Sequence, residues 1–399
     1  MVNKINSVAF KINENVLDFI LNNNDKYGFF TNPNDNHPLT FKNDKQLSLS
    51  EKKEIESFNS KKHLELNILG LATIFRNVPN LYFPVRLDYR GRLYCVTEYL
   101  NYQGIELSKG LLLFSKGEEV SLKDDLAIKY LKIFGANCFG NKLDKKSFND
   151  RIEWIDNNLE NIINFDNGVL LKKAENKIVF LSFCFEYSNY NKALNNNDLS
   201  FKSNLPIQLD ASCNGFQHLS LLVDDLALSK ELNLNKAKWE DMPKDFYSFI
   251  ALKIKNFFSK SLDEYDAGNL NLNPENKESY AKLAKVEIFR ALIKKAVMTT
   301  PYNASTYSII EYLKENFDKV KNPNFTESSI TNTDKNNDYY LYVPKIQKST
   351  AVIYKEIDFK NLRKALNFVL FIDYPKLTAL AEYLKDIANI SNKLKIPIP

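Results

Sequence analysis

The stretch that decides the fold is residues 205–225, LPIQLDASCNGFQHLSLLVDD. It opens with an apolar, β-prone run that reaches Asp210 and continues with four small residues, Ala211 to Asn214. Gly215, the polar pair Gln217 and His218 and a second apolar run follow. The pattern predicts a strand that leaves its sheet at Asp210.

A carboxylate at the end of a strand is well placed to bind a metal ion. Mg²⁺ takes oxygen ligands, and usually only one or two of them are protein carboxylates, because water and substrate phosphates supply the rest. For a lone Asp, a turn or a helix cap is the more common role. The residues that follow Asp210 therefore decide between the two interpretations.

These residues resemble the metal-binding motif of the single-subunit RNA polymerases of bacteriophages and mitochondria. In that family the motif is Asp, two small residues, Cys, a small residue, Gly, an apolar residue, Gln and His. The matching residues here are Asp210, Ala211, Ser212, Cys213, Asn214, Gly215, Phe216, Gln217 and His218. The resemblance implies that Asp210 binds both catalytic Mg²⁺ ions.

The composition permits this interpretation without requiring it. The chain has 399 residues, of which 44% are hydrophobic and 26% charged, values that are ordinary for a soluble globular protein with two or three domains. The net charge of +5 is compatible with a polyanionic partner or with a solvated Lys-rich surface. No run is long and apolar enough to predict a membrane span.

The four cysteines are scattered without a CxxC pair, so a reducing compartment is expected and a zinc site or disulfide framework is not. The N-terminus, MVNKINSVAF, resembles neither a secretory signal nor a transit peptide. A mitochondrial location would therefore indicate a protein that is encoded in the organelle or on a plasmid.

Local patterns predict a mostly helical chain. Residues 10–21 have helical apolar spacing, Ser48 and Glu51 form a capping box before a helix that reaches Arg76, and residues 81–100 favour strands. Helices are also expected in 121–163, 243–259, 278–300 and 362–394, the last with interruptions at Pro375 and near Ile390. Residues 179–187 fit a buried helix or a strand equally well, and residues 322–338 predict a loop.

A second constellation is LDYRGRLY, residues 87–94, in which Arg90 and Arg92 flank Gly91. Two guanidinium groups beside a glycine suit phosphate or sugar oxygens, although a surface turn would have the same residues. The resemblance extends to this pattern and to the Gln103-Gly104 and Lys109-Gly110-Leu111-Leu112 elements. It implies that Arg92 and Lys109, together with His218, contact the nucleic acid.

A third constellation is RALIKKAVMTTPY, residues 290–302. Arg290, Lys294 and Met298 lie on one face of a helix, where two cations one turn apart can bind neighbouring phosphates. A solvated basic face is the alternative. The resemblance favours the first interpretation, because the family has Arg, Lys four residues later and Tyr eight residues after that. It implies that Arg290 and Lys294 hold the triphosphate and that Tyr302 contacts the sugar and the templating base.

Two departures from the family pattern follow this helix. Asn303 replaces the usual Gly, and Asn is the residue that best tolerates a positive φ after Gly. Pro301 is also unusual there and is expected to end the helix early.

Gly215 separates RNA synthesis from DNA synthesis. DNA polymerases with a related fold share the Arg-Lys-aromatic helix but carry a Glu five residues after the metal-binding Asp, where it crowds a ribose 2′-OH. Gly215 has no side chain at this position. The resemblance therefore implies ribonucleotide transfer in which two Mg²⁺ ions activate the RNA 3′-OH and neutralise the leaving pyrophosphate.

Such a site needs a second carboxylate, which the family supplies in an apolar-His-Asp-Ser hairpin. None of the three His residues precedes an Asp, and Asp373, in FID, is interpreted as structural. The isolated chain is therefore expected to have little or no activity. It is expected to be part of a split or longer polymerase, with the second Asp on another polypeptide or on further downstream sequence. The alternative is an inactive remnant that binds nucleic acid.

The resemblance implies an α+β, predominantly helical, right-hand polymerase fold with part of the thumb, a partial palm and fingers. The expected parts are a thumb-like region, residues 1–82, the first part of the palm, residues 83–225, and the fingers, residues 226–399, with the nucleotide-binding helix in 278–302. The implied partners are a DNA template, an RNA product and ribonucleoside triphosphates.

Overall fold

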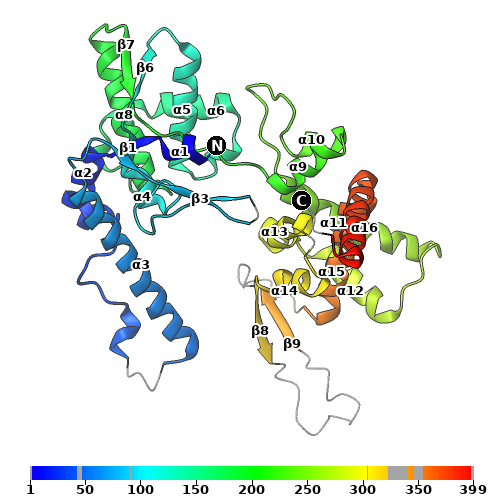
Figure 1. Cartoon of the computed structure of the whole chain (residues 1–399). Coiled ribbons are helices and arrows are strands. Elements are labelled where there is room, and N and C mark those ends of the chain that lie inside the picture. Colours follow the sequence, from blue (N-terminus) through cyan, green and yellow to red (C-terminus); the bar gives the residue numbers. More distant parts are fainter. Residues whose placement is uncertain are drawn as a thin grey trace. The chain divides into compact units, whose positions relative to one another are not determined.

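The computed structural model describes residues 2–42, 47–89, 91–302, 304–321, 340–344 and 354–396. Arg90, Asn303 and the predicted loop 322–338 lie outside these ranges. The chain divides into two compact units (Figure 1). Unit 1 comprises Met1–Leu209 and Lys238–Met242, and unit 2 comprises Asp210–Ala237 and Pro243–Pro399.

Unit 1 combines helices with three small antiparallel sheets. Its helices are α1 (Val2–Asn6), α2 (Glu14–Tyr27), α3 (Leu49–Ile74), α4 (Glu106–Gly110), α5 (Asp125–Phe139), α6 (Phe148–Asn157), α7 (Leu159–Ile163) and α8 (Lys177–Asn195), with 3₁₀ turns η1 (Pro38–Phe41), η3 (Leu143–Lys145) and η4 (Phe165–Asn167). Its strands are β1 (Ala9–Ile12), β2 (Leu81–Tyr82), β3 (Val85–Leu87), β4 (Leu93–Cys95), β5 (Leu112–Phe114), β6 (Glu118–Ser121) and β7 (Ser200–Ser203).

The three sheets tie distant segments of unit 1 together. β1 lies between β2 and β5, with Phe10 opposite both Leu81 and Phe114. β3 pairs with β4 as a hairpin, and β6 pairs with β7 across 78 intervening residues, so that Glu118 lies opposite Ser203. All of these pairs are antiparallel, as expected for short strands with one solvated face.

Helix α8 forms the centre of the first core. Phe180, Phe183 and Cys184 are fully buried, and Ile178 and Tyr187 are nearly so. Its residues 178–187 are buried or partly buried on every side, because α2, α4, α5 and α7 all pack against the helix. This burial on every side explains why the sequence alone did not separate a helix from a buried strand in residues 179–187.

Helix α3 begins where its sequence predicts, whereas α2 begins later than predicted. The capping box is present, because Ser48 Oγ accepts from the Glu51 amide at 3.2 Å while the Glu51 carboxylate accepts from the Ser48 amide at 2.9 Å. In Figure 1, α3 extends away from the rest of unit 1. The helix predicted from residue 10 is wrong at its start, because Phe10 and Ile12 lie in β1, and α2 begins at Glu14 after the Asn13 cap.

Unit 2 is almost entirely helical. Its helices are α9 (Asn214–Leu222), α10 (Leu226–Glu231), α11 (Phe246–Asp266), α12 (Pro274–Lys285), α13 (Arg290–Thr299), α14 (Thr306–Lys314), α15 (Glu356–Asn367) and α16 (Pro375–Leu394), with a 3₁₀ turn η5 (Thr300–Tyr302) and a π-helical turn η8 (Phe368–Ile372). The strands β8 (Phe317–Lys321) and β9 (Tyr340–Pro344) pair antiparallel.

The core of unit 2 lies between α11, α12, α13 and α15. Ile250, Phe258, Leu292 and Phe359 are fully buried there. The predicted single helix over 278–300 is wrong, because residues 286–289 separate α12 from α13 and Ile288 turns into the core. The break places Arg290 in the first turn of α13. The interruption at Pro375 is confirmed, whereas α16 runs without a break past Ile390.

None of the helices within the described ranges combines the length and the apolar character that crossing a membrane requires.

A buried carboxylate holds α12 against α15. Asp358 is fully buried and accepts from Ser279 Oγ at 2.7 Å and from Lys282 Nζ at 2.6 Å. It also accepts from the Lys355 amide at 2.7 Å, so each of its oxygens has a donor.

We expect Asp358→Ala to lower the free energy of unfolding by about 3–5 kcal/mol, because it leaves the Lys282 ammonium without its partner. The control is Glu315→Ala, which removes an ion pair with Lys295 whose side chains are both half-exposed and costs about 0–1 kcal/mol. Urea unfolding followed by circular dichroism measures both. Equal losses in the two variants would contradict the assignment of Asp358 as a buried structural anchor.

Candidate functional site

The segment that leads to Asp210 is anchored in unit 1. Glu186 on α8 is buried beside the Ser203 hydroxyl and the amides of Asn204 and Leu205. Burial raises the pKa of the Glu186 carboxyl, and these neighbouring donors offset part of the rise. The Asn204 side chain donates to the carbonyl of Phe114 at 2.7 Å. The chain therefore leaves unit 1 from a fixed point.

The prediction of a strand that ends at Asp210 is wrong. β7 ends at Ser203, and residues 204–210 have no regular structure. A strand needs a neighbour, and none of the described strands pairs with this segment. Consequently Ile207 and Leu209 are 57% and 93% exposed, and Asp210 is exposed at the end of an unpaired apolar segment.

A strained turn connects Asp210 to α9. Asp210 Oδ1 accepts from the Ala211 amide at 2.8 Å. Cys213 adopts the left-handed conformation, with φ of 64°, at the N-cap position of α9. A side chain other than Gly or Asn is unfavourable in this region. Phe216 then anchors α9, packing its ring 5.2 Å from that of Phe246.

Gly215 brings the start of α9 against the end of α13. A Cβ atom at Gly215 would lie 3.2 Å from Cβ and Cγ of Pro301 and 3.7 Å from the hydroxyl of Tyr302. The helix ends at Thr299, as Pro301 predicts, and η5 carries Tyr302 to this contact. Residues 215 and 302 therefore lie side by side although 87 positions separate them in the sequence.

Helix α13 presents its cations on its solvent face. Leu292, Ile293, Ala296 and Val297 are fully buried, whereas Arg290, Lys294 and Met298 lie on the opposite, partly exposed face. The predicted alignment of these three residues is confirmed. No side chain caps the N-terminus of α13, where the helix dipole also favours an anion.

Two residues at the start of α11, the N-cap Asp245 and Tyr247, lie next to the cations. The carboxylate of Asp245 lies 2.9 Å from Nε of Arg290. The ring of Tyr247 lies 5.1 Å from the guanidinium carbon of Arg290 and 6.0 Å from the ammonium of Lys294. Burial opposes ionisation of Asp245, but hydrogen bonds from Ser248 and the charge of Arg290 outweigh it and lower the Asp245 pKa.

The hydroxyl of Tyr247 reaches the turn after Asp210, where it hydrogen-bonds to the thiol of Cys213. Burial raises the pKa of both groups, and the contact with Cys213 raises that of Tyr247 further. Sequence reasoning missed Asp245 and Tyr247. The only signal was an Asp two residues before an aromatic residue at the start of a predicted helix, which is too common to indicate a site.

The described residues of the arginine-rich pattern 87–94 lie in unit 1, where Leu87 ends β3 and Leu93 begins β4. Gly91 has φ of 74°, and the Arg92 amide donates to Asp88 Oδ1 at 2.8 Å. Gln103 fixes the hairpin, because its side chain accepts from the Cys95 amide and donates to the Leu93 carbonyl. The Arg92 side chain is exposed. This loop is thus a surface turn that presents a cation.

Lys109 lies on α4 of unit 1 and is half-buried. The glycine after it has a packing role, because a Cβ at Gly110 would lie 2.7 Å from Cγ2 of Ile178 on α8. His218 is exposed on α9, next to Gln217, whose side chain donates to the Leu232 carbonyl. Asp373 pairs with Lys253 at 2.7 Å, which agrees with a structural role.

Of the predicted site residues, only Asp210 carries a carboxylate that could bind a metal ion. Within the described ranges, no three His, Cys, Asp or Glu side chains gather as metal ligands. Asp210 nevertheless fits Mg²⁺, because its carboxylate is exposed and hard, and Mg²⁺ can take its other ligands from water and substrate phosphates.

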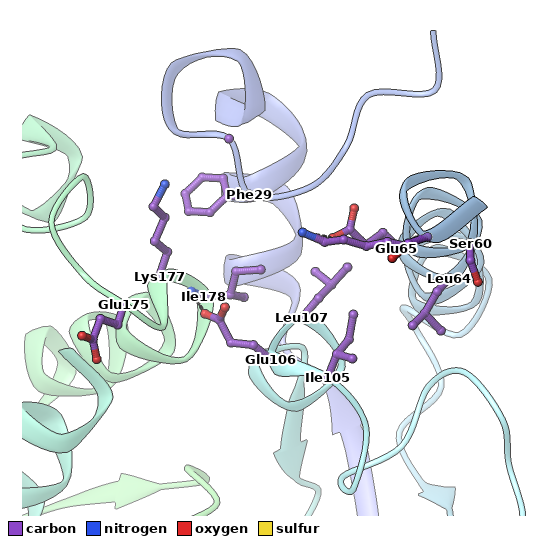
Figure 2. A pocket seen from close by; sticks show the side chains of 13 residues that line it. Phe29, Ser60, Leu64, Glu65, Ile105, Glu106, Leu107, Glu175, Lys177 and Ile178 are labelled. Carbon is purple, nitrogen blue, oxygen red and sulfur yellow. Dashed lines mark hydrogen bonds and ion pairs between the residues drawn. The ribbon is translucent and has the colours of Figure 1, made fainter. Parts of the chain in front are cut away.

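A cavity of about 560 Å³ lies elsewhere, in unit 1, between α3, α4 and the start of α8 (Figure 2). Phe29, Leu64 and Leu107 give it apolar walls, and Glu106 and Lys177 add charge. These charged groups already have partners, since Glu106 accepts from the Ile178 amide at 2.5 Å and Lys177 donates to the Tyr27 carbonyl at 2.7 Å. The cavity contains none of the predicted site residues.

The fold is a helical α+β chain in which the start of α9, after the Asp210 turn, packs against the end of α13. The family described as DNA-dependent RNA polymerase matches residues 123–385. The chain belongs to this family, and its predicted resemblance to the single-subunit RNA polymerases is confirmed.

The chain is similar to three kinds of relative. It is 46% identical over its full length to a probable DNA-directed RNA polymerase of Podospora anserina, of which it spans 40%. Over 62% of its length it is 29% identical to T7 RNA polymerase of Escherichia phage T7, of which it spans 28%. Over 65% of its length it is 32% identical to a mitochondrial DNA-directed RNA polymerase of Neurospora crassa, of which it spans 17%.

We expect Cys213 to be alkylated by iodoacetamide more slowly than a cysteine in an unstructured peptide at pH 8, because burial raises the pKa of its thiol and the thiolate is the reactive form. Mass spectrometry of the full chain, with the denatured chain as the control, gives the rate for each thiol. A Cys213 rate equal in the folded and denatured chain would contradict the buried contact with Tyr247.

Proposed function

We propose that this chain forms part of the catalytic region of a DNA-directed RNA polymerase and binds a ribonucleoside triphosphate between α9 and α13. The observation that carries the proposal is the contact of Gly215 with Pro301 and Tyr302. It brings the segment of Asp210 to the helix that carries Arg290 and Lys294. Two motifs that are far apart in the sequence thus meet in one unit.

Each residue of this site has a distinct task. Arg290 and Lys294 bind the phosphates of the incoming nucleotide, since they are cations one helical turn apart on an exposed face. A phosphate at this place also meets the uncapped N-terminus of α13. Lys294 and Tyr302 align the nucleotide for attack by the RNA 3′-OH, and alignment accounts for much of the catalysis of phosphoryl transfer.

Asp210 is the residue that would hold Mg²⁺, with phosphate and water oxygens as further ligands. When bound, Mg²⁺ supplies the positive charge that neutralises the phosphates and favours the ionised 3′-OH. A second carboxylate from the remaining length of the polymerase, on this or another polypeptide, would complete the ligand set.

The exposed residues Ile207 and Leu209 mark where further polymerase sequence would join the chain. They lie two positions apart in a segment without regular structure that has no described strand beside it. A strand added here would bury both side chains and would satisfy the backbone of the segment before Asp210. We therefore place the missing part of a palm sheet at this edge.

We further propose part of a right-hand polymerase fold. It has a thumb-like region in residues 1–82, the first part of a palm in residues 83–225 and fingers in residues 226–399. Arg92, Lys109 and His218 contact the DNA template and the RNA product. The names of the mitochondrial relatives support a mitochondrial location. We further propose that the gene lies in the organelle or on a plasmid.

The alternative is a remnant that binds nucleic acid without catalysis. Extension of an RNA primer on an RNA–DNA scaffold, with Mg²⁺ and ribonucleotides, distinguishes the two. The chain is tested alone and together with a polypeptide that carries an apolar-His-Asp-Ser segment. Extension that is lost in Asp210→Asn supports the polymerase. Salt-sensitive binding without extension, equal in Asp210→Asn, supports the remnant.

A substitution at Gly215 tests how the sugar is recognised. We expect Gly215→Glu to weaken binding of ATP about tenfold or more while binding of dATP falls less, because the new side chain projects beside the Tyr302 hydroxyl and occupies the space of a ribose 2′-OH. Fluorescence titration measures both affinities.

Gly70→Glu is the matched control, since the surroundings of Gly70 on α3 are open. We expect it to leave both affinities unchanged. Equal losses for ATP and dATP in Gly215→Glu would contradict a role of Gly215 in accepting the ribose.

A further inference from the structure

Tyr247 is a side chain that reaches both halves of the proposed site. It is the second residue of α11 and is 7% exposed. The face of its ring lies against the two cations of α13, and its hydroxyl reaches the turn that follows Asp210. No motif of the sequence assigns it a role.

The ring of Tyr247 offsets the repulsion between the two cations. Arg290 and Lys294 carry like charges one turn apart, an arrangement that is unfavourable on a helix. The negative face of an aromatic ring attracts both cations without neutralising them. At Lys294, a carboxylate in the same place would remove the charge that phosphates require. Within the described ranges, no carboxylate lies within ion-pair distance of Lys294.

Asp245 complements the ring at Arg290. Its Oδ2 approaches Nε of the guanidinium at 2.9 Å, and the same carboxylate caps α11 through the amide of Tyr247. The guanidinium of Arg290 therefore has a carboxylate near Nε and the ring of Tyr247 beside it. This geometry suits a bidentate contact with phosphate oxygens.

The hydroxyl of Tyr247 stabilises a backbone conformation that is otherwise unfavourable. Cys213 has φ of 64° and lies three residues after Asp210. The hydrogen bond to its thiol holds this residue against α11. A shift of the turn would move Asp210, whereas a shift of the ring would move the cations.

We propose that Tyr247 is a positioning residue that fixes the distance between the Asp210 turn and the triphosphate-binding cations of α13. The proposal rests on the proposed function, because it takes Arg290 and Lys294 as the phosphate ligands. It adds the residue that preorganises them, and it predicts separate effects for the ring and the hydroxyl.

The ring is tested by binding of inorganic tripolyphosphate to the full-length chain, measured by calorimetry at low ionic strength. We expect Tyr247→Leu to weaken binding about fivefold, Tyr247→Phe to restore most of the lost affinity, and Tyr307→Leu to have no effect. Tyr307 is the matched control because it is an exposed tyrosine on α14 of the same unit. Affinity in Tyr247→Leu equal to that in Tyr307→Leu would overturn the proposal.

The hydroxyl is tested by hydrogen exchange of the backbone amides of residues 211–216. Tyr247→Phe retains the ring and therefore the fold, so we expect faster exchange in this segment and unchanged exchange in α12 and α15. Unchanged exchange in residues 211–216 would overturn the hydroxyl's role, even if Tyr247→Leu fails to fold.

Lys294→Ala distinguishes the failure of this proposal from the failure of the proposed function. If Lys294→Ala binds tripolyphosphate as tightly as the native chain, the phosphate site itself is wrong, and the role of Tyr247 falls with it. If Lys294→Ala weakens binding while Tyr247→Leu does not, the site stands and only the positioning role is overturned.

Discussion

The close contact of Gly215 with Pro301 and Tyr302 is the constraint on which the site depends. It requires a residue without a side chain at the start of α9 and a chain that leaves the helical path after Thr299. The absence of a side chain at residue 215 leaves room beside the Tyr302 hydroxyl. The end of the helix at Thr299 brings that hydroxyl next to Gly215. Because interiors pack tightly, a single added carbon at residue 215 would be felt by both segments.

Each unit anchors its own segments of the chain. In unit 1, Glu186 and Asn204 fix the segment that leaves toward Asp210, and the buried helix α8 carries the first of them. In unit 2, the buried faces of α11 and α13 place Tyr247 below the cations. Asp210 is exposed, and Arg290 and Lys294 are partly exposed, so all three can meet a polyanionic substrate.

Sequence patterns predicted local features that depend on neighbouring residues. The capping box at Ser48, the end of α13 before Pro301 and the cation face of α13 are examples. Features that depend on distant partners were not predictable. The β-prone run before Asp210 forms no strand because no described strand lies beside it, and Phe10 joins a sheet because Leu81 and Phe114 flank it. Tyr247 was missed because its importance lies in three long-range contacts.

The most direct test of the central claim is metal-directed cleavage of the full-length chain, with Fe²⁺ in place of Mg²⁺ and with a ribonucleoside triphosphate and a reductant present. Radicals formed at the bound iron cut the nearby backbone. Our account predicts fragments that end near residues 210–215 and near residues 300–302, and the loss of both in Asp210→Asn. Fragments from only one of the two segments, or a pattern that Asp210→Asn leaves unchanged, would contradict a single site formed by α9 and α13.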